Sequence, residues 1–267
     1  MTQVFEGFFG FTRTPFGKDL SASELFPAAG HQEVLLRMQY LVRTRGLGVV
    51  DAEIGCGKTT TVRTLVSSLD PSRHRFLTLL APGSPRGMYR ALSSQLALEP
   101  RWLTADAARQ VGDALSALTS QGVTPVLVVD EAHLVPEPLL TALRFLTQGQ
   151  LDAASPLALL LVGQLSLLST LRLKKHEALT QRINLRCHLE CLGAKETQAY
   201  VEHHLRLAGR EEPLFTAGAQ ELIFHHSRGV PRLINTLATH ALLAAFQQQQ
   251  ALVDDRVMQR VLQENEL

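Results

Sequence analysis

The sequence predicts an α/β fold in which a parallel five-stranded sheet is followed by an all-helical region. Short apolar runs alternate with segments of helical spacing as far as about residue 190. Several of these runs are uninterrupted, as is typical of strands buried on both faces of a parallel sheet. Beyond Gly193 the strand signal stops. We therefore expect two domains, an α/β core over residues 1–192 and a helical domain over residues 193–267.

The expected elements follow from apolar periodicity and from the glycine and proline residues between them. The expected strands are residues 47–50, 75–80, 125–129, 157–163 and 185–189. The expected helices are residues 61–69, 88–98, 105–118, 136–147, 195–207, 217–226, 231–246 and 254–263.

Composition limits the class of protein. The chain has 267 residues, of which 45% are hydrophobic and 19% charged, so it can bury a large core. The formal net charge of +1 neither indicates nor excludes a nucleic-acid partner. No apolar segment reaches the roughly 20 residues that span a bilayer, and no leader is recognisable. Three cysteines cannot build a disulfide framework, so we expect a cytoplasmic, reducing compartment.

The first chemical motif is the segment AEIGCGKT at residues 52–59, which fits the P-loop (Walker A) pattern except that Ala52 replaces the first glycine. Glycines let backbone N–H groups turn around phosphates, the lysine pairs with the β- and γ-phosphates, and the threonine hydroxyl ligates magnesium. The alternative is an ordinary glycine turn before a helix. The residues expected to bind ATP are Gly55, Cys56, Gly57, Lys58, Thr59 and Thr60, and Thr59 is also expected to ligate Mg²⁺.

The second motif is VLVVDEAH at residues 126–133, a Walker B pattern at the carboxyl end of an expected strand. Open α/β sheets bind ligands at this end of their strands, which puts the acidic pair beside the phosphate loop. We expect Asp130 to hold Mg²⁺, through water, and Glu131 to polarise the attacking water. The alternative is an acidic pair that only caps the next helix.

Three further polar residues fit a catalytic role in ATP hydrolysis. Gln164 follows an expected strand and could contact the γ-phosphate or the water; alternatively it is a loop residue. Arg232 lies in the first turn of a C-terminal helix, where the macrodipole disfavours a cation, so another partner is expected. Arg182 precedes the last expected strand, as a finger inserted into a neighbour's site would; its alternative is a surface salt bridge.

The order of these motifs resembles a known module. FFGF at residues 8–11, Pro15-Phe16, GCGKTT, VVDEAH, LVGQ, QRI and GVPRLIN are similar to the AAA+ ATPase module of ExeA-like secretion proteins and of transposon ATPases related to TnsC and IstB. The resemblance implies a P-loop AAA+ core with a helical lid, sensor 1 at Gln164, a finger at Arg182, sensor 2 at Arg232 and Mg²⁺-dependent ATP hydrolysis. It also implies self-assembly into a ring or a helical filament. Ala52 and Asp51 depart from the family pattern and could slow turnover.

The resemblance leaves the biological role open. ExeA-like proteins usually continue into a membrane helix and a periplasmic region, and the chain ends at Leu267 without them, so we expect the transposition role. In that role the protein assembles with ATP on double-stranded DNA and recruits or activates a transposase, and hydrolysis drives disassembly. The alternatives are a secretion or pilus-assembly ATPase acting on envelope proteins, and a switch that binds nucleotide and barely hydrolyses it.

Candidate DNA contacts lie in the turn after the second expected strand, where Arg86 and Arg90 could face a pore. Lys174 and Lys175 form a second basic patch. The alternative for these residues is solvated surface charge, and contacts to phosphates here would be independent of DNA sequence.

Other patterns point to structure rather than chemistry. Cys187, His188 and Cys191 lack a second ligand pair, so we do not expect zinc. We expect Phe8, Phe9, Phe11 and Phe16 to pack the N-terminal segment over the rim of the nucleotide pocket; the alternative is that they stack on the bases of DNA.

Overall fold

The computed structural model describes residues 2–17, 19–148 and 155–264 and divides the chain into two compact units. The first comprises Gly30–Glu53 and Lys58–Leu189, and we call it the α/β unit. The second comprises Met1–Ala29, Ile54–Gly57 and Glu190–Leu267, and we call it the helical unit.

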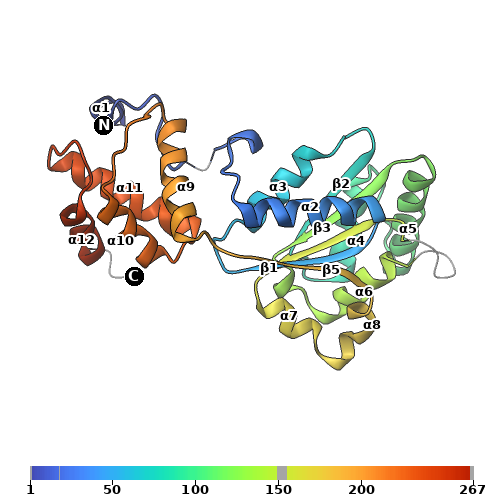
Figure 1. Ribbon diagram of the computed structural model, residues 1–267. Helices are drawn as coiled ribbons and strands as arrows, with labels where there is room; N and C mark the ends of the chain where they lie inside the picture. Colours follow the sequence, from blue (N-terminus) through green and yellow to red (C-terminus); the bar gives the residue numbers. More distant parts are fainter. Residues whose placement is uncertain (1, 18, 149–154, 265–267) are drawn as a thin grey trace. The chain divides into compact units, whose positions relative to one another are not determined.

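The α/β unit is built on a parallel five-stranded sheet, which confirms the predicted fold class (Figure 1). The strands are β1 (Leu47–Ala52), β2 (His74–Leu80), β3 (Thr124–Asp130), β4 (Ala158–Gly163) and β5 (Ile183–Leu189). Their order across the sheet is β2-β3-β4-β1-β5. The carboxyl ends of β3, β4 and β1 therefore lie side by side, which brings the segments that follow them together.

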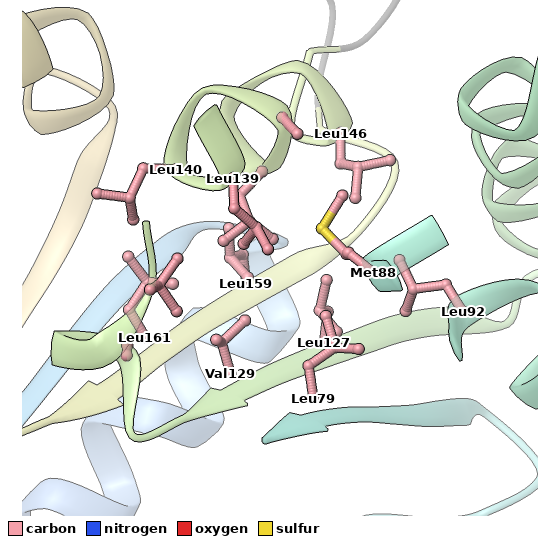
Figure 2. Close-up of a cluster of buried hydrophobic side chains, with 14 of the residues drawn as sticks. Leu79, Met88, Leu92, Leu127, Val129, Leu139, Leu140, Leu146, Leu159 and Leu161 are labelled. Atoms are coloured by element: carbon pink, nitrogen blue, oxygen red, sulfur yellow. The ribbon is translucent and has the colours of Figure 1, made fainter. Parts of the chain in front are cut away.

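Helices cover both faces of this sheet. They are α2 (Ala29–Thr44), α3 (Lys58–Ser68), α4 (Pro85–Gln95), α5 (Thr104–Ser120), α6 (Glu137–Leu146), α7 (Ser166–Leu171) and α8 (Glu177–Thr180). Alternate strand residues such as Leu127, Val129, Leu159 and Leu161 pack against α4 and α6 (Figure 2). Residues of α5, α7 and α8 belong to the same core. On the other face, α2 approaches so closely that a Cβ on Gly48 would lie 2.8 Å from Leu41 Cδ2.

The helical unit contains α1 (Thr2–Phe9), α9 (Ala194–Leu207), α10 (Ala217–Ser227), α11 (Pro231–Gln247) and α12 (Asp255–Glu264). Each helix has one apolar side, and these sides share one core. The four C-terminal helices match the predicted ones to within two residues.

The N-terminal segment belongs to the helical unit, whereas the predicted division put residues 1–192 together. Its aromatic side chains supply the reason. Phe5, Phe9, Phe11 and Phe16 are buried in the core of the helical unit, and the rings of Phe5 and Phe246 lie 5.7 Å apart. The backbone N–H of Thr12 also donates to the carbonyl of Ala208 at 2.8 Å. These phenylalanines therefore pack as structural residues, and they do so in the core of the helical unit.

Among the residues that the structure describes, no helix combines the length and the apolar character that crossing a bilayer requires.

Candidate active site

The phosphate loop joins β1 to α3. Gly55 has φ +88° and Gly57 has φ +100°, in the left-handed region that glycine adopts without steric cost. Lys58, the first residue of α3, is 8% exposed, and its Nζ donates to the carbonyl oxygens of Ala52 at 3.0 Å and Glu53 at 2.9 Å. The loop therefore directs a buried ammonium group and the positive end of a helix toward one place, an arrangement that suits an anion.

Two oxygen groups from different elements meet beside this loop. The hydroxyl of Thr59, in the first turn of α3, donates to Asp130 Oδ2 at 3.2 Å. Asp130 ends β3, and only β4 separates β3 from β1 in the sheet. The order of the strands therefore places Asp130 near the loop and helix that follow β1. A hydroxyl and a carboxylate are the hard oxygen ligands that Mg²⁺ prefers, so Thr59 and Asp130 fit the metal expected with ATP.

Glu131 follows Asp130 in a conformation that side chains rarely adopt. Its φ is +51°, which costs about 1–3 kcal/mol for a residue other than glycine. Its backbone N–H donates to Asp130 Oδ1 at 2.8 Å. Its Oε2 lies 3.5 Å from His133 Nδ1. Such strain beside a carboxylate pair is typical of a functional site.

His133 connects Glu131 to the next strand. The N–H of Gln164 donates to His133 Nδ1 at 3.4 Å, which makes that ring nitrogen an acceptor. Its approach to Glu131 is then not a hydrogen bond, and the carboxylate oxygens remain able to accept from water.

Gln164 stands between the two motifs. Gly163, the last residue of β4, pairs with Asp51 of β1, so Gln164 lies level with Ala52, where the loop begins. Because β4 separates β1 from β3, the residue after β4 lies between the phosphate loop and the acidic pair. The structure thus brings Lys58, Thr59, Asp130, Glu131 and Gln164 to one end of the sheet.

Comparison with known proteins identifies this arrangement. Residues 41–171 match the family described as AAA domain. This match covers 131 of the 267 residues, just under half of the chain. General secretion pathway protein A of Aeromonas hydrophila is 34% identical over 251 residues, which are 91% of this chain and 45% of that protein. The chain therefore spans less than half the length of this curated relative.

Solved structures share the fold at low identity. Cdc6p of Pyrobaculum aerophilum aligns with a TM-score of 0.71 and 16% identity over 93% of this chain and 70% of its own. The Drosophila ORC bound to DNA gives a TM-score of 0.69 and 18% identity over 100% and 66% of the two chains. The Thermotoga maritima RuvB Holliday junction branch migration motor aligns with a TM-score of 0.62 and 17% identity over 93% of this chain and 73% of its own. At these identities the matches show the shared fold. The family match over residues 41–171 and the motif residues at the carboxyl end of the sheet support ATPase activity.

Arg232 lies close to the tip of the phosphate loop within the helical unit. A Cβ on Gly55 would lie 2.9 Å from Val230 Cγ1 and 3.0 Å from Arg232 Cβ, so a side chain at residue 55 would collide with the start of α11. The Arg232 side chain itself is exposed.

Arg182 lies at the opposite end of the sheet from the phosphate loop. It precedes Ile183, which pairs with Leu47 at the start of β1, whereas the loop follows Ala52 at the end of that strand. Five residue steps along a strand span about 17 Å. Arg182 lines a cavity of about 510 Å³ at this far end, together with Tyr40 and Asn184. It therefore cannot reach the loop of its own chain.

The cysteines differ from the expectation. Cys56, in the phosphate loop, forms a disulfide with Cys191, and their Cα atoms are 5.1 Å apart. The low cysteine count had argued against a disulfide framework, but one bond needs only two residues close together. Cys187 has a free, buried thiol whose pKa is raised by burial.

Asp51 has a partner that the sequence did not reveal. Asp51 is 2% exposed, and its Oδ2 lies 2.7 Å from Nδ1 of His188, on the neighbouring strand β5. The charge beside the phosphate loop is thus hydrogen-bonded inside the sheet.

The candidate DNA contacts lie on exposed helical segments of the α/β unit. Arg86 and Arg90 lie on α4, and the Arg86 guanidinium lies 4.6 Å from the centroid of the Trp102 ring, which is 80% exposed. Trp102 was not among the predicted contacts, although it is the single tryptophan of the chain. Lys174 is exposed, while Lys175 pairs with Glu137 and lowers the pKa of that carboxyl.

Proposed function

We propose that this protein is an ATP-dependent regulator that assembles on double-stranded DNA, recruits or activates a transposase, and disassembles when ATP is hydrolysed. The observation that carries the ATPase part is the gathering of Lys58, Thr59 and Asp130 at the carboxyl end of one sheet. Lys58 would pair with the β- and γ-phosphates, and Thr59 with Asp130 would hold Mg²⁺, which supplies positive charge to the phosphates.

Two neighbouring residues would act on the attacking water. Glu131 is the candidate for polarising this water, because it directly follows Asp130, the expected metal ligand. The nearby Nδ1 of His133 accepts a hydrogen bond from Gln164, so it does not donate to the Glu131 carboxylate. Gln164 is the candidate for sensing the γ-phosphate, because it lies between the phosphate loop and Glu131. Arg232 is the candidate for a second sensor, because Gly55 packs against it.

The site would be completed by a second copy of the chain in a ring or filament. Arg182 lies about 17 Å along the sheet from its own loop, so any contact it makes with nucleotide must be with that of a neighbour. Mixing Lys58→Ala with Arg182→Ala protein tests this. Each variant alone should be inactive, whereas the mixture should regain activity at interfaces where an intact loop meets an intact arginine. A mixture as inactive as its parts would refute the finger role.

The DNA part rests on the α4 surface. Arg86 and Arg90 are exposed cations, and the Arg86–Trp102 stack offers charge for phosphates and an aromatic face for a base or sugar. One relative in fold was solved bound to DNA. Lys174 is a further candidate, whereas the charge of Lys175 is partly neutralised by Glu137.

The decisive experiment measures ATP hydrolysis and sedimentation with and without double-stranded DNA at low and moderate salt. We expect DNA with ATP to drive assembly that weakens as salt rises. Arg86→Ala should reduce the salt slope by about one. The matched control is Arg260→Ala, which removes an exposed arginine from α12. If DNA changes neither hydrolysis nor assembly, the transposition proposal fails.

A second candidate is a secretion or pilus-assembly ATPase that acts on envelope proteins. The 34% identity to a general secretion pathway protein, over 91% of this chain, favours it. DNA-independent hydrolysis that responds to membrane or envelope proteins would select this function. A third, a nucleotide switch that barely hydrolyses ATP, would be selected if Glu131→Gln behaved like the wild type. We place the DNA-linked activity in the cytoplasm.

A further inference from the structure

The Cys56–Cys191 disulfide lies inside the phosphate loop, which makes it a candidate for redox control of nucleotide binding. The two residues are 135 positions apart, yet their Cα atoms are separated by 5.1 Å, within the range of ordinary disulfides. Cys56 lies between the two glycines whose positive φ angles shape the loop. Any restraint on Cys56 is therefore a restraint on the groups that would hold phosphate.

The disulfide closes a ring of contacts within the helical unit. Gly55 packs against Val230 and Arg232 at the start of α11. Gly229, one residue earlier, accepts a hydrogen bond from the N–H of Leu192 at 2.9 Å. A Cβ on Gly229 would lie 1.8 Å from the Leu192 carbonyl oxygen, so these backbones are in direct contact. Leu192 follows Cys191, which completes the ring through the disulfide.

The ring is closed covalently only in the oxidised protein. With the sulfurs joined, the loop, residues 191–192 and the start of α11 are held together by a covalent bond as well as by packing. With the sulfurs reduced, the covalent link is lost and non-covalent contacts remain, among them the hydrogen bond from Leu192 to Gly229, so the loop would separate from Arg232 more readily. A nucleotide held by both the loop and Arg232 would be released more easily when they separate.

We infer that Cys56 and Cys191 form a reversible thiol–disulfide switch that slows nucleotide release when oxidised. The inference rests on the proposed ATP site. The switch would exchange with a low-molecular-weight thiol such as glutathione and with the disulfide of that thiol. It would add a redox input that ATP hydrolysis itself does not require.

The exposure of the two sulfurs sets the order of exchange. Cys56 is fully buried, whereas Cys191 is partly exposed. A thiolate attacks Sγ of Cys191, the S–S bond breaks, and Cys56 leaves as a thiolate near the positive end of α3. A second thiolate attacks the external sulfur of the mixed disulfide and releases Cys191. The two external thiols are thereby oxidised to one disulfide, and the protein gains two electrons and two protons.

The test compares release of a fluorescent, non-hydrolysable ATP analogue from oxidised and reduced protein, with thiols counted by mass after alkylation. Equilibration with glutathione disulfide should remove two of the three thiols and slow release at least tenfold, and dithiothreitol should reverse both effects. Cys191→Ser should not respond to either reagent. Cys187→Ser is the matched control, because it removes the free buried cysteine, and it should respond like the wild type.

Two results would overturn the switch: three alkylatable thiols at every glutathione ratio, or equal release rates in the two redox forms. Neither measurement involves DNA or hydrolysis. Failure of DNA-dependent assembly would therefore leave the switch standing. A protein that binds no nucleotide in either redox form would refute the proposed ATPase function and leave the switch with nothing to control.

Discussion

His204 should make the stability of the helical unit depend on pH. It lies in α9 and is 3% exposed, and its ring stacks on Phe16 at 5.2 Å and lies 4.5 Å from Tyr200. Burial, with smaller contributions from His203 and Arg13, lowers the pKa of His204 from 6.5 to about 4. The folded protein therefore holds this imidazole neutral at pH values where the unfolded chain would protonate it.

The sign and size of the effect follow from proton linkage. Between pH 6.5 and 4 the unfolded chain protonates this histidine and the folded protein does not. The free energy of unfolding is therefore unaffected by His204 above pH 6.5 and decreases as pH falls toward 4. With these two pKa values the loss is roughly 2 kcal/mol between pH 7 and 5 and about 3 kcal/mol by pH 4. His204→Phe keeps an aromatic ring and removes the titrating group.

The assay must report on the helical unit. Amide hydrogen exchange in α9, corrected for intrinsic rates, gives its opening free energy at pH 7, 6 and 5. Between pH 7 and 5, the opening free energy of the wild type should fall by roughly 2 kcal/mol more than that of His204→Phe. Fluorescence of Trp102, the single tryptophan of the chain, reports on the α/β unit and provides an internal control. A difference that stays constant from pH 7 to 5 would refute the buried neutral histidine.

Other variants test the backbone, the chemistry and the crosslink. Gly229→Ala should destabilise the protein by at least about 3 kcal/mol in urea unfolding, because its Cβ would collide with Leu192 and its φ is positive. Gly112→Ala, in open space on α5, should instead stabilise it by about 0.5–1 kcal/mol. Glu131→Gln should slow ATP turnover by about 10²–10⁴ in a coupled assay while nucleotide binding persists; unchanged turnover would exclude it as the base. Reducing the disulfide, or Cys191→Ser, should cost about 5 kcal/mol in the chain-entropy account for a 135-residue separation, and a thermal midpoint unchanged by dithiothreitol would contradict this.

The strands and the chemistry at their ends were predictable because both depend on residues close in sequence. Apolar runs located the five strands, and each structural boundary lies within two residues of the expected one. The motif at residues 52–59 and the acidic pair at 130–131 each follow a strand directly. In a parallel sheet such segments must share an edge, so Lys58 and Asp130 could be expected to converge.

The N-terminal region was poorly predicted because its apolar residues do not reveal their partners. The aromatic residues of the first segment contact α11, more than 200 positions away, and nothing local distinguishes that core from the α/β core. The helix α2 was not predicted. Its four buried apolar residues, Val34, Met38, Leu41 and Val42, recur at helical spacing and most of its other residues are polar or charged, a pattern that does indicate an amphipathic helix.

Two long-range contacts at the phosphate loop, Asp51 with His188 and Cys56 with Cys191, both result from the position of β5 in the sheet. Because β5 lies next to β1, Asp51 pairs with His188 and Ala52 with Leu189. Residues just beyond the ends of the two strands are therefore neighbours, and Cys56 meets Cys191 there. The strand order was absent from the sequence prediction, which gave five strands without neighbours. With that order, cysteines four and two residues beyond the ends of adjacent strands would have predicted the disulfide, since parallel strands finish at the same edge.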